Sequence, residues 1–404
     1  MTRVSLVTTT INIPFFLEGI LKNYKKNKSK FNFQIIVIGD KKTPFAINKF
    51  LNRLKTKYLK NIIYYDIKKQ DKFFKKKYNK IYKLFPYNDA LRKLLGSIIL
   101  LTNKKEKSDK IIFIDDDNYV TNKINFLKDF DIVGSNYRGN LISNLKGWPN
   151  LYKSFIERNN IPIFPRGFPW LYRNKQSLIF KNKKANGQKV IANCGFILGD
   201  PDIDAVSRLF NKIETIGVKN KNYFVLAKNN YFPLNDQNLC IAKEYLPLYY
   251  KPIAAGRNSD IWTSYLISKV ASYHNELISY GKPHLTQIRN VHDFWNDYEL
   301  EKEHNIATDF FVEILKNIKL NRNKNRFNNY LKLCFDGIKI CERKIKKINK
   351  DKIEILKKST RHYQNISAQN RIKRDIYSLK YIIKYFKEYL LWLKLIKFYK
   401  LENY

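Results

Sequence analysis

The first 120 residues alternate between short apolar runs and longer stretches in which apolar positions recur at helical spacing. Short β-branched runs bounded by turn residues are typical of buried strands, whereas apolar residues three and four positions apart indicate amphipathic helices. Strands are expected at 4–9, 33–38, 61–65 and 110–114, and helices from Pro14, from Thr43-Pro44 to about Leu54, and over 87–101. Strands separated by helices form right-handed βαβ units, so this region predicts a mostly parallel sheet flanked by helices.

The pattern changes toward the C-terminus. Residues 130–200 are rich in loops, and from about residue 300 glycine and proline become rare while helical periodicity dominates. We therefore expect an α/β domain over 1–300 and an all-helical basic region over 301–404. Within it, 376–400 predicts an amphipathic helix with its lysines on one narrow stripe. Such a helix either lies in an anionic membrane interface or packs its apolar face on the rest of the protein.

Composition and charge exclude several classes of protein. The 404 residues include 77 Lys+Arg against 35 Asp+Glu, a formal net charge of +42, but 15% of them are aromatic, unlike a disordered basic tail. The basic residues are spread along the whole chain, so a dedicated nucleic-acid surface is not expected. Four cysteines form no disulfide framework and favour a cytoplasmic setting. No apolar stretch reaches the roughly 18 residues of a membrane span.

Three consecutive carboxylates, Asp115, Asp116 and Asp117, directly follow the predicted strand 110–114. They repel one another and need a cation or strong hydrogen bonds to remain ionised together. Mg²⁺ and Mn²⁺ take oxygen ligands, usually one or two carboxylates together with substrate phosphates. In an extended D-x-D, Asp115 and Asp117 share a face, so one can hold a ribose hydroxyl while the other holds the metal on a diphosphate. The alternative is an acidic turn at a strand end.

Ligands of parallel α/β sheets bind at the carboxyl ends of the strands. This rule places the ends of the predicted strands on one rim, beside the helix 87–101. We expect the nucleotide-binding residues to be Thr8, Thr9, Asp40, Asn88, Arg92, Asp115 and Asp116. Two of these have an equally simple structural explanation, since Asp40 follows a glycine in a possible turn and Arg92 suits an ordinary solvated helix position.

Further candidates lie in the second half of the chain. Arg166 and Arg173 flank a segment rich in proline and aromatic residues, PRGFPWLYR, and arginine binds phosphate or carboxylate groups bidentately. Asp260 stands at a loop-to-helix transition, where it is either a helix cap or a general base in a cleft. His284 is a candidate to complete a carboxylate metal site. The acidic cluster 200–204 is either a second acidic site or a helix cap.

Taken together, these segments resemble the nucleotide-sugar glycosyltransferases of the GT-A fold. More narrowly, they resemble the clan that holds the reversibly glycosylated polypeptides (UDP-arabinopyranose mutases) and the plant STELLO proteins. The similarity runs in order across residues 4–290, through VSLVTTTIN, IIVIGDKKTP, PYNDALRKLLG, FIDDDN, PRGFPWLYR, CGF…PDIDA and GRNSDIWTSYLISKV. The second, third and sixth segments look closest to STELLO, whereas the triple aspartate and the paired arginines look closer to the mutases. The basic helical tail belongs to neither pattern.

The resemblance implies a Rossmann-like GT-A domain in which Asp115 and Asp117 bind the nucleotide and a Mn²⁺ or Mg²⁺ ion. His284 matches a histidine that follows the last catalytic helix. Arg166 matches the arginine that becomes reversibly glycosylated in the mutases, and Arg173 matches its essential partner.

The leading hypothesis is a metal-dependent glycosyltransferase with Asp260 as its base. It would move sugar from a nucleotide sugar, UDP-linked, to a glycan or lipid-linked acceptor in surface polysaccharide synthesis. Two alternatives remain open. One is a nucleotide-sugar mutase with reversible self-glycosylation. The other is a non-enzymatic basic module for a membrane or nucleic acid, in which the aspartates are merely structural. For the enzyme we expect a cytoplasmic protein, held at the inner face of the membrane by the helix 376–400.

Overall fold

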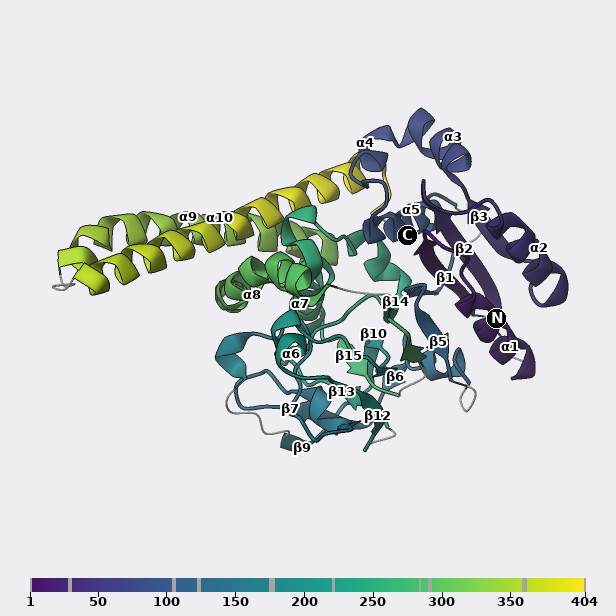
Figure 1. Cartoon of the computed structure of the whole chain (residues 1–404), viewed down its shortest axis with the longest axis horizontal. Helices are drawn as coiled ribbons and strands as arrows, with labels where there is room; N and C mark the ends of the chain where they lie inside the picture. The colour runs from purple at the N-terminus through teal and green to yellow at the C-terminus, as the bar shows by residue number, and fades with distance from the viewer. Residues whose placement is uncertain are drawn as a thin grey trace.

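The computed structural model describes residues 2–27, 31–103, 107–121, 125–173, 179–219, 222–282, 285–289, 293–357 and 362–402. Its centre is a nine-stranded sheet with the strand order β13-β15-β10-β14-β4-β1-β2-β3, in which β6 also pairs with β10 (Figure 1). The strands are β1 (Arg3–Thr10), β2 (Asn32–Gly39), β3 (Ile62–Tyr65), β4 (Lys110–Ile114), β6 (Asn136–Tyr137), β10 (Gln188–Cys194), β13 (Phe224–Val225), β14 (Asn238–Ala242) and β15 (Leu277–Tyr280).

Most strands of this sheet run in one direction. β3, β2, β1 and β4 are mutually parallel. β14 is antiparallel to both β4 and β10, which turns β10 and its parallel partner β15 back into the direction of the first four strands. β6 and β13 pair antiparallel with β10 and β15. The expected mixed α/β class with a mostly parallel sheet is therefore confirmed, with β14 as an antiparallel insertion in its middle.

The N-terminal elements form as the apolar pattern predicts, with two local differences. Every residue of β4 is buried, as the run KIIFI requires of a central strand. Thr43 does not cap the next helix, which begins at Ile47. Its hydroxyl instead donates to the carbonyl of Thr10 at 2.6 Å and accepts from the amide of Asp40 at 2.7 Å, so it ties together the ends of β1 and β2.

The helix expected over 87–101 is divided into a 3₁₀ turn, η1 (Ala90–Arg92), and the helix α5 (Lys93–Thr102). A Cβ atom on Gly96 would lie 2.4 Å from Cγ1 of Val7, so only glycine allows α5 to approach β1 this closely. The other helices before residue 290 are α1 (Phe16–Lys26), α2 (Ile47–Lys57), α3 (Ile67–Lys77), α4 (Asn79–Tyr82), α6 (Ala205–Phe210) and α7 (Ser259–Tyr273).

Two smaller sheets complete the α/β part. One has five strands in the order β5-β16-β11-β12-β8, namely Asn118–Val120, Leu285–Gln287, Ile197–Gly199, Thr215–Val218 and Phe155–Glu157. The other pairs β7 (Asn140–Ser143) with β9 (Ile179–Lys184). Because β5 begins directly after the triple aspartate and pairs with β16, the five-stranded sheet forms a wall beside the end of β4.

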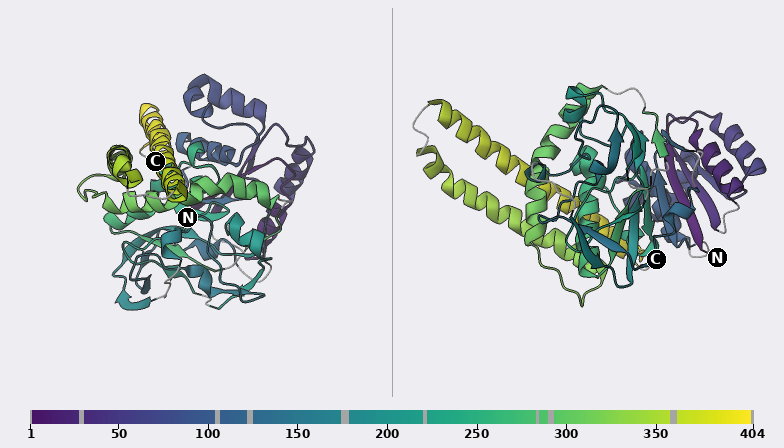
Figure 2. Two further views of the ribbon diagram at one scale, coloured as in Figure 1. Left: turned by 60° about the vertical axis from the view of Figure 1, so that its left-hand side comes forward. Right: turned by 90° about the horizontal axis from the view of Figure 1, so that it is seen from below.

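Three long helices follow, α8 (Phe294–Asn317), α9 (Arg326–Lys357) and α10 (His362–Phe398). α9 and α10 form an antiparallel hairpin whose outer half extends away from the body (Figure 2). The expected boundary after residue 300 falls inside α8. The apolar residues of all three helices continue the same hydrophobic core as the sheet. Among the described residues no helix is both long and apolar enough to cross a membrane.

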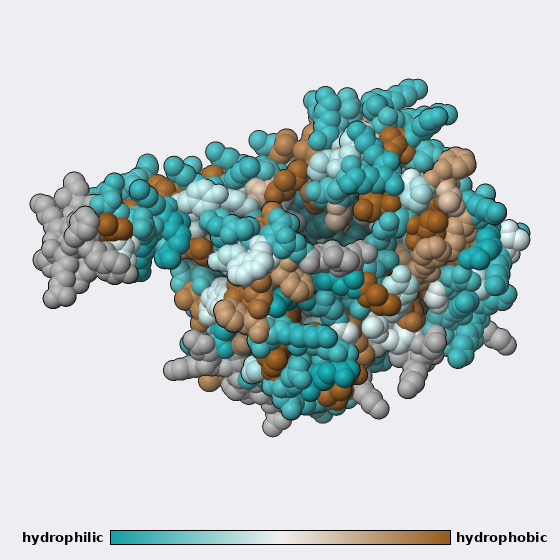
Figure 3. Space-filling model, in the orientation of Figure 1, coloured by the Kyte–Doolittle hydropathy of each residue, from teal (hydrophilic) through white to brown (hydrophobic). Residues whose placement is uncertain are grey.

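Most apolar residues of 376–400 pack against the rest of the protein, the second of the two arrangements expected for this helix. Its buried members are Leu379, Ile382, Tyr385, Phe386, Tyr389, Trp392, Leu393 and Ile396, whereas Tyr377, Leu391 and Phe398 are exposed. Trp392 stacks on Tyr250 with ring centroids 4.7 Å apart and donates from Nε1 to the carbonyl of Pro247 at 2.9 Å. The exposed surface of the hairpin is largely hydrophilic (Figure 3).

Candidate functional site

The triple aspartate lies where the strand order of the main sheet reverses, since β1 has β2 on one side and β4 on the other. Ligands of open α/β sheets bind in the crevice outside such a point. Thr10 ends β1, and its hydroxyl donates to Oδ2 of Asp116 at 2.6 Å. Burial raises the pKa of Asp116, and the hydrogen bond from Thr10 opposes that rise. Asp116 therefore links the end of β1 to the end of β4 at the base of the crevice.

Asp115 belongs to a row of alternating charges. Lys93, at the start of α5, is buried and donates from Nζ to Oδ1 of Asp115 and to the carbonyl of Asp236 at 2.9 Å. Lys251 contacts the Asp236 carboxylate at 2.6 Å. Burial alone would raise the pKa of Asp236, but the ammonium groups of Lys251 and Lys93 hold it at about 2. The row therefore places the two carboxylates beside two buried ammonium groups.

Asp117, like Asp116, forms no ion pair with the other described residues. Its Oδ2 accepts from Nε2 of Gln287 at 2.9 Å, and its Oδ1 accepts from Nδ2 of Asn118 at 3.2 Å. Burial and the nearby charge of Asp115 raise the pKa of Asp117 to about 6. An added cation would stabilise the ionised form of Asp117, which burial and the charge of Asp115 both disfavour.

The chemistry of this donor set fits a hard divalent cation. Asp117 and Asp115 would supply carboxylate oxygens, and Gln237, on the same cavity wall, has a buried Oε1 atom with no protein partner. Within the described ranges, no group of three or more His, Cys, Asp or Glu side chains forms a complete metal site. Mg²⁺ and Mn²⁺ need no such group, because substrate phosphates and water usually fill most of their coordination positions.

A cavity of about 570 Å³ joins these carboxylates to distant parts of the chain. Its volume is in the range of small-molecule sites. A recess is visible in the middle of the molecular face shown in Figure 3. Five of the residues expected from the sequence line the cavity, namely Asn88, Asp115, Asp117, Arg166 and Asp260.

Arg166 forms the centre of the opposite wall. Its Nε and Nη2 atoms donate to the two oxygens of Asp202 at 2.8 and 2.9 Å, a bidentate pair. Nη1 and Nη2 each lie 3.4 Å from an oxygen of Asp260, and Nη1 also donates to the carbonyl of Arg257. Burial opposes the charge on Arg166, but Asp202 and Asp260 keep its pKa well above the ordinary value. Asp260 itself has a pKa raised by burial, which Arg166 only partly offsets.

Asp260 lies in the first turn of α7 and is not its N-cap, because Asn258, two residues earlier, ends the 3₁₀ turn η6 (Ile253–Asn258) and occupies that position. Gly256, within η6, has φ +45°, and a Cβ there would lie 2.7 Å from the imidazole of His304. The turn therefore needs glycine, and it places Asp260 on the cavity wall. Asp204 of the acidic cluster does cap a helix, because it accepts from the amide of Ser207 at 2.9 Å.

Five expected nucleotide-binding residues do not line the cavity, namely Asp116, which Thr10 holds, and four residues behind the cavity wall. Arg92 is fully buried and donates to the carbonyl of Phe85 at 3.1 Å, to Tyr82 and to Gln70, so it is no solvated charge either. Asp40 accepts from the amide of Asn88 at 2.7 Å and thereby holds the loop that carries Asn88. Thr8 and Thr9 likewise lie outside the cavity lining: Thr8 is fully buried, and Thr9 donates to the carbonyl of Ile38 at 2.9 Å.

Arg173 also lies away from this cavity. Its Nη2 atom donates to Asp204 at 2.7 Å and to the carbonyl of Phe168 at 3.3 Å, and its guanidinium stacks on Trp170 at 3.7 Å from the ring centroid. It therefore fixes the loop that follows Arg166 and touches no other candidate residue. The proposed metal ligand His284 lies outside the described residues.

Several cavity residues escaped the sequence analysis, and the antiparallel strand β14 explains the most important of them. Residues that precede an antiparallel strand lie at the same sheet edge as residues that follow its parallel neighbours. Asp236 and Gln237 immediately precede β14 and so join the triple aspartate. The polar run NDQN before an apolar strand was the available signal. Lys251, Arg289 and His304 carry no local signal of this kind.

No protein-family model matches this chain, and no curated protein matches it significantly.

Proposed function

We propose that this protein is a metal-dependent glycosyltransferase that uses a nucleotide sugar, with UDP as the favoured nucleotide. One observation carries the proposal: Asp115 and Asp117, at the reversal point of the sheet, face the same cavity as Arg166 and Asp260. A nucleoside diphosphate bound there would meet carboxylates suited to a divalent cation on one side and a buried acid–base pair on the other.

The architecture supports a GT-A type of domain. The parallel order β3-β2-β1-β4, with helices in the connections, matches the strand order of the nucleotide-binding half of doubly wound folds. The segments that resemble GT-A enzymes in sequence supply β1, β2, α5, β4 and α7. Five of the segments reach the cavity: through the loop before η1, the end of β4, Arg166, Asp202 and the start of α7.

The chain's own residues have separable roles in the proposed reaction. Lys93 and Lys251 place fixed positive charge beside the expected diphosphate, an arrangement that needs no reorganisation as charge develops on the leaving group. Asp117 and Asp115 would hold Mn²⁺ or Mg²⁺, which when bound supplies Lewis-acid stabilisation of that leaving group. The raised pKa of Asp260 suits a base that accepts the proton of an acceptor hydroxyl.

The ion pairs of Arg166 favour transfer to an acceptor over self-glycosylation. A guanidinium nitrogen must lose a proton before it can attack a sugar carbon, and two carboxylates stabilise the protonated form here. Arg166 is therefore assigned the positioning of Asp260 and Asp202. The acceptor is a glycan or a lipid-linked saccharide, and the four cysteines, all free and buried, suit a cytoplasmic enzyme.

The test is titration of UDP-glucose, UDP-galactose and GDP-mannose with MnCl₂, followed by hydrolysis assays with the best ligand. We expect Asp117→Asn to weaken Mn²⁺-dependent binding and to lower hydrolysis by about 10²–10³-fold, as loss of an electrostatic contact to the transition state does. Asp336→Asn is the matched control, since Asp336 pairs with Lys332 on α9. The proposal is wrong if no nucleotide sugar binds, or if the two variants behave alike.

A further inference from the structure

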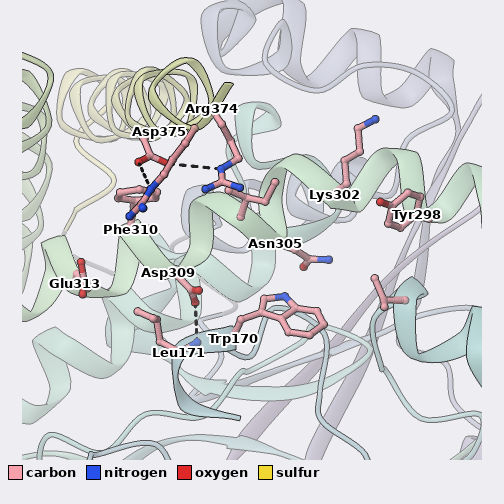
Figure 4. Close-up of a pocket in the computed structure, with 13 residues that line it drawn as sticks. Trp170, Leu171, Tyr298, Lys302, Asn305, Asp309, Phe310, Glu313, Arg374 and Asp375 are labelled. Atoms are coloured by element: carbon pink, nitrogen blue, oxygen red, sulfur yellow. Dashed lines mark hydrogen bonds and ion pairs between the residues drawn. The ribbon is translucent and has the colours of Figure 1, made fainter. Parts of the chain in front are cut away.

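A second cavity, of about 510 Å³, lies between α8, the 3₁₀ turn η4 (Trp170–Tyr172), α6 and the basic first part of α10 (Figure 4). None of its lining residues belongs to the cavity that holds the triple aspartate. The two cavities are nevertheless neighbours, because they share α8. Leu300 and His304 line the first cavity, and Asn305 and Asp309 line the second.

Asn305 lines this second cavity and carries an unsatisfied buried amide. Its side chain is only 6% exposed, yet neither its carbonyl oxygen nor its amide nitrogen has a hydrogen-bond partner. A buried amide without partners costs free energy, so native proteins keep one where a ligand or water completes it. The amide can both donate and accept, which matches a group that does the same, such as a hydroxyl.

Trp170 supplies a flat apolar surface below Asn305 (Figure 4). Its side chain remains 41% exposed, although the guanidinium of Arg173 covers one face of the ring. A large aromatic ring that is both held in place and partly open to a cavity can pack against the apolar C–H face of a sugar ring. The cation on its other face fixes the indole in one orientation.

The cavity is lined by equal numbers of carboxylates and cations, so these groups do not select a strongly charged ligand. The carboxylates are Asp309, Glu313 and Asp375, and the cations are Lys302, Arg371 and Arg374. Asp375 lies 3.9 Å from Arg371 and 3.6 Å from Arg374. Asp309 accepts from the amide of Leu171 at 3.4 Å, which aligns its carboxylate beside Trp170. Oriented carboxylates are strong acceptors for hydroxyl donors.

We propose that this cavity binds a pyranose unit of a neutral glycan, with Trp170 as the stacking surface and Asn305 and Asp309 as partners of its hydroxyl groups. The inference rests on the proposed function and names the acceptor's chemistry as a neutral oligosaccharide. Arg166 lines the first cavity and Trp170 the second, and with three residues between them their Cα atoms are at most about 14 Å apart. One oligosaccharide can therefore lie in the second cavity and present its end to Asp260.

The experiment is saturation-transfer NMR and calorimetry of the full chain, without nucleotide sugar, against maltotetraose, cellotetraose and xylotetraose. We expect at least one of them to bind, and both Trp170→Ala and Asn305→Leu to weaken it at least tenfold. Asn305→Leu removes an amide that has no protein partner, so its melting temperature should not fall, which separates lost binding from lost folding. Trp295→Ala is the matched control, since Trp295 is 69% exposed on α8 and does not line the cavity.

The inference fails if none of the three saccharides binds the wild type, or if Trp170→Ala and Trp295→Ala bind them equally well. It also fails if UMP or AMP occupies the cavity and displaces the saccharide, because the site would then recognise a base. Nucleotide-sugar binding is measured separately on the same samples. Loss of that binding alone would overturn the proposed function, whereas absence of saccharide binding alone would overturn only this inference.

Discussion

The hydroxyl of Thr10 donates a 2.6 Å hydrogen bond to Oδ2 of Asp116, a residue 106 positions further along the chain. The bond crosses the point where the strand order reverses and fixes the middle aspartate of the triplet. Asp115 and Asp117, on either side of it, remain directed into the cavity. The arrangement of the triplet thus depends on a neighbouring strand as well as on its own sequence.

Replacing Thr10 by valine should therefore destabilise the protein and weaken nucleotide-sugar binding. Hydrogen bonds to charged groups contribute about 1.5–3 kcal/mol, and the valine variant leaves the buried carboxylate without this donor. Urea unfolding and calorimetry with UDP-glucose and MnCl₂ measure both effects. Thr10→Ser keeps the hydroxyl and should retain most of the stability; equal losses in the serine and valine variants would contradict the role assigned to the bond.

Arg166→Ala should destabilise the fold by about 3–5 kcal/mol, because it leaves the buried carboxylates of Asp202 and Asp260 without their cation. Arg166→Lys restores the charge but not the bidentate geometry, so an intermediate loss is expected. The matched control is Arg158→Ala, which breaks an exposed pair with Glu214 that is worth at most about 1 kcal/mol. Urea titration of the three variants gives the ranking, and an Arg166→Ala variant as stable as Arg158→Ala would refute it.

His304 should make the protein sensitive to mild acid. Burial lowers its pKa from the ordinary 6.5 to about 4. Below pH 6.5 the unfolded chain therefore binds a proton that the folded protein excludes, so stability falls as the pH drops from 6.5 toward 4 and changes no further below that. The shift corresponds to about 3 kcal/mol. Unfolding free energies at pH 7, 5.5 and 4 should show this loss in the wild type and a smaller loss in His304→Gln; identical pH profiles would exclude His304 as the cause.

Trp392→Ala tests whether the last helix packs or binds membranes. The side chain is fully buried against Tyr250, so truncation should cost about 3–5 kcal/mol. Leu391, its neighbour in the sequence, is 46% exposed, and Leu391→Ala should change stability by no more than about 0.5 kcal/mol. Sedimentation with phosphatidylglycerol vesicles should give the same result for both variants. Reduced vesicle binding by Trp392→Ala at unchanged stability would favour the membrane role instead.

Much of the fold follows from local patterns in the chain. β4 occupies the predicted residues 110–114, and β1, β2 and β3 begin and end within one residue or so of the predicted runs. The reason is that buried strands of a parallel sheet need continuous apolar runs, which turn residues interrupt clearly. The basic helical C-terminal region also follows from periodicity. The Asp115–Asp117 triplet was recognisable because three carboxylates after a buried strand are costly without a partner.

Only the tertiary structure decided which groups share the site. It turned β14 antiparallel, and this brought Asp236 and Gln237 to the edge where the parallel strands end. It buried Arg92 and placed the adjacent Lys93 beside Asp115. Which of these two basic residues faces Asp115 depends on their angular positions around the helix axis and not on the composition of the segment. It also turned the apolar stripe of α10 inward. Local sequence determines which faces are apolar, but the partner that covers each face depends on contacts between residues far apart in the chain.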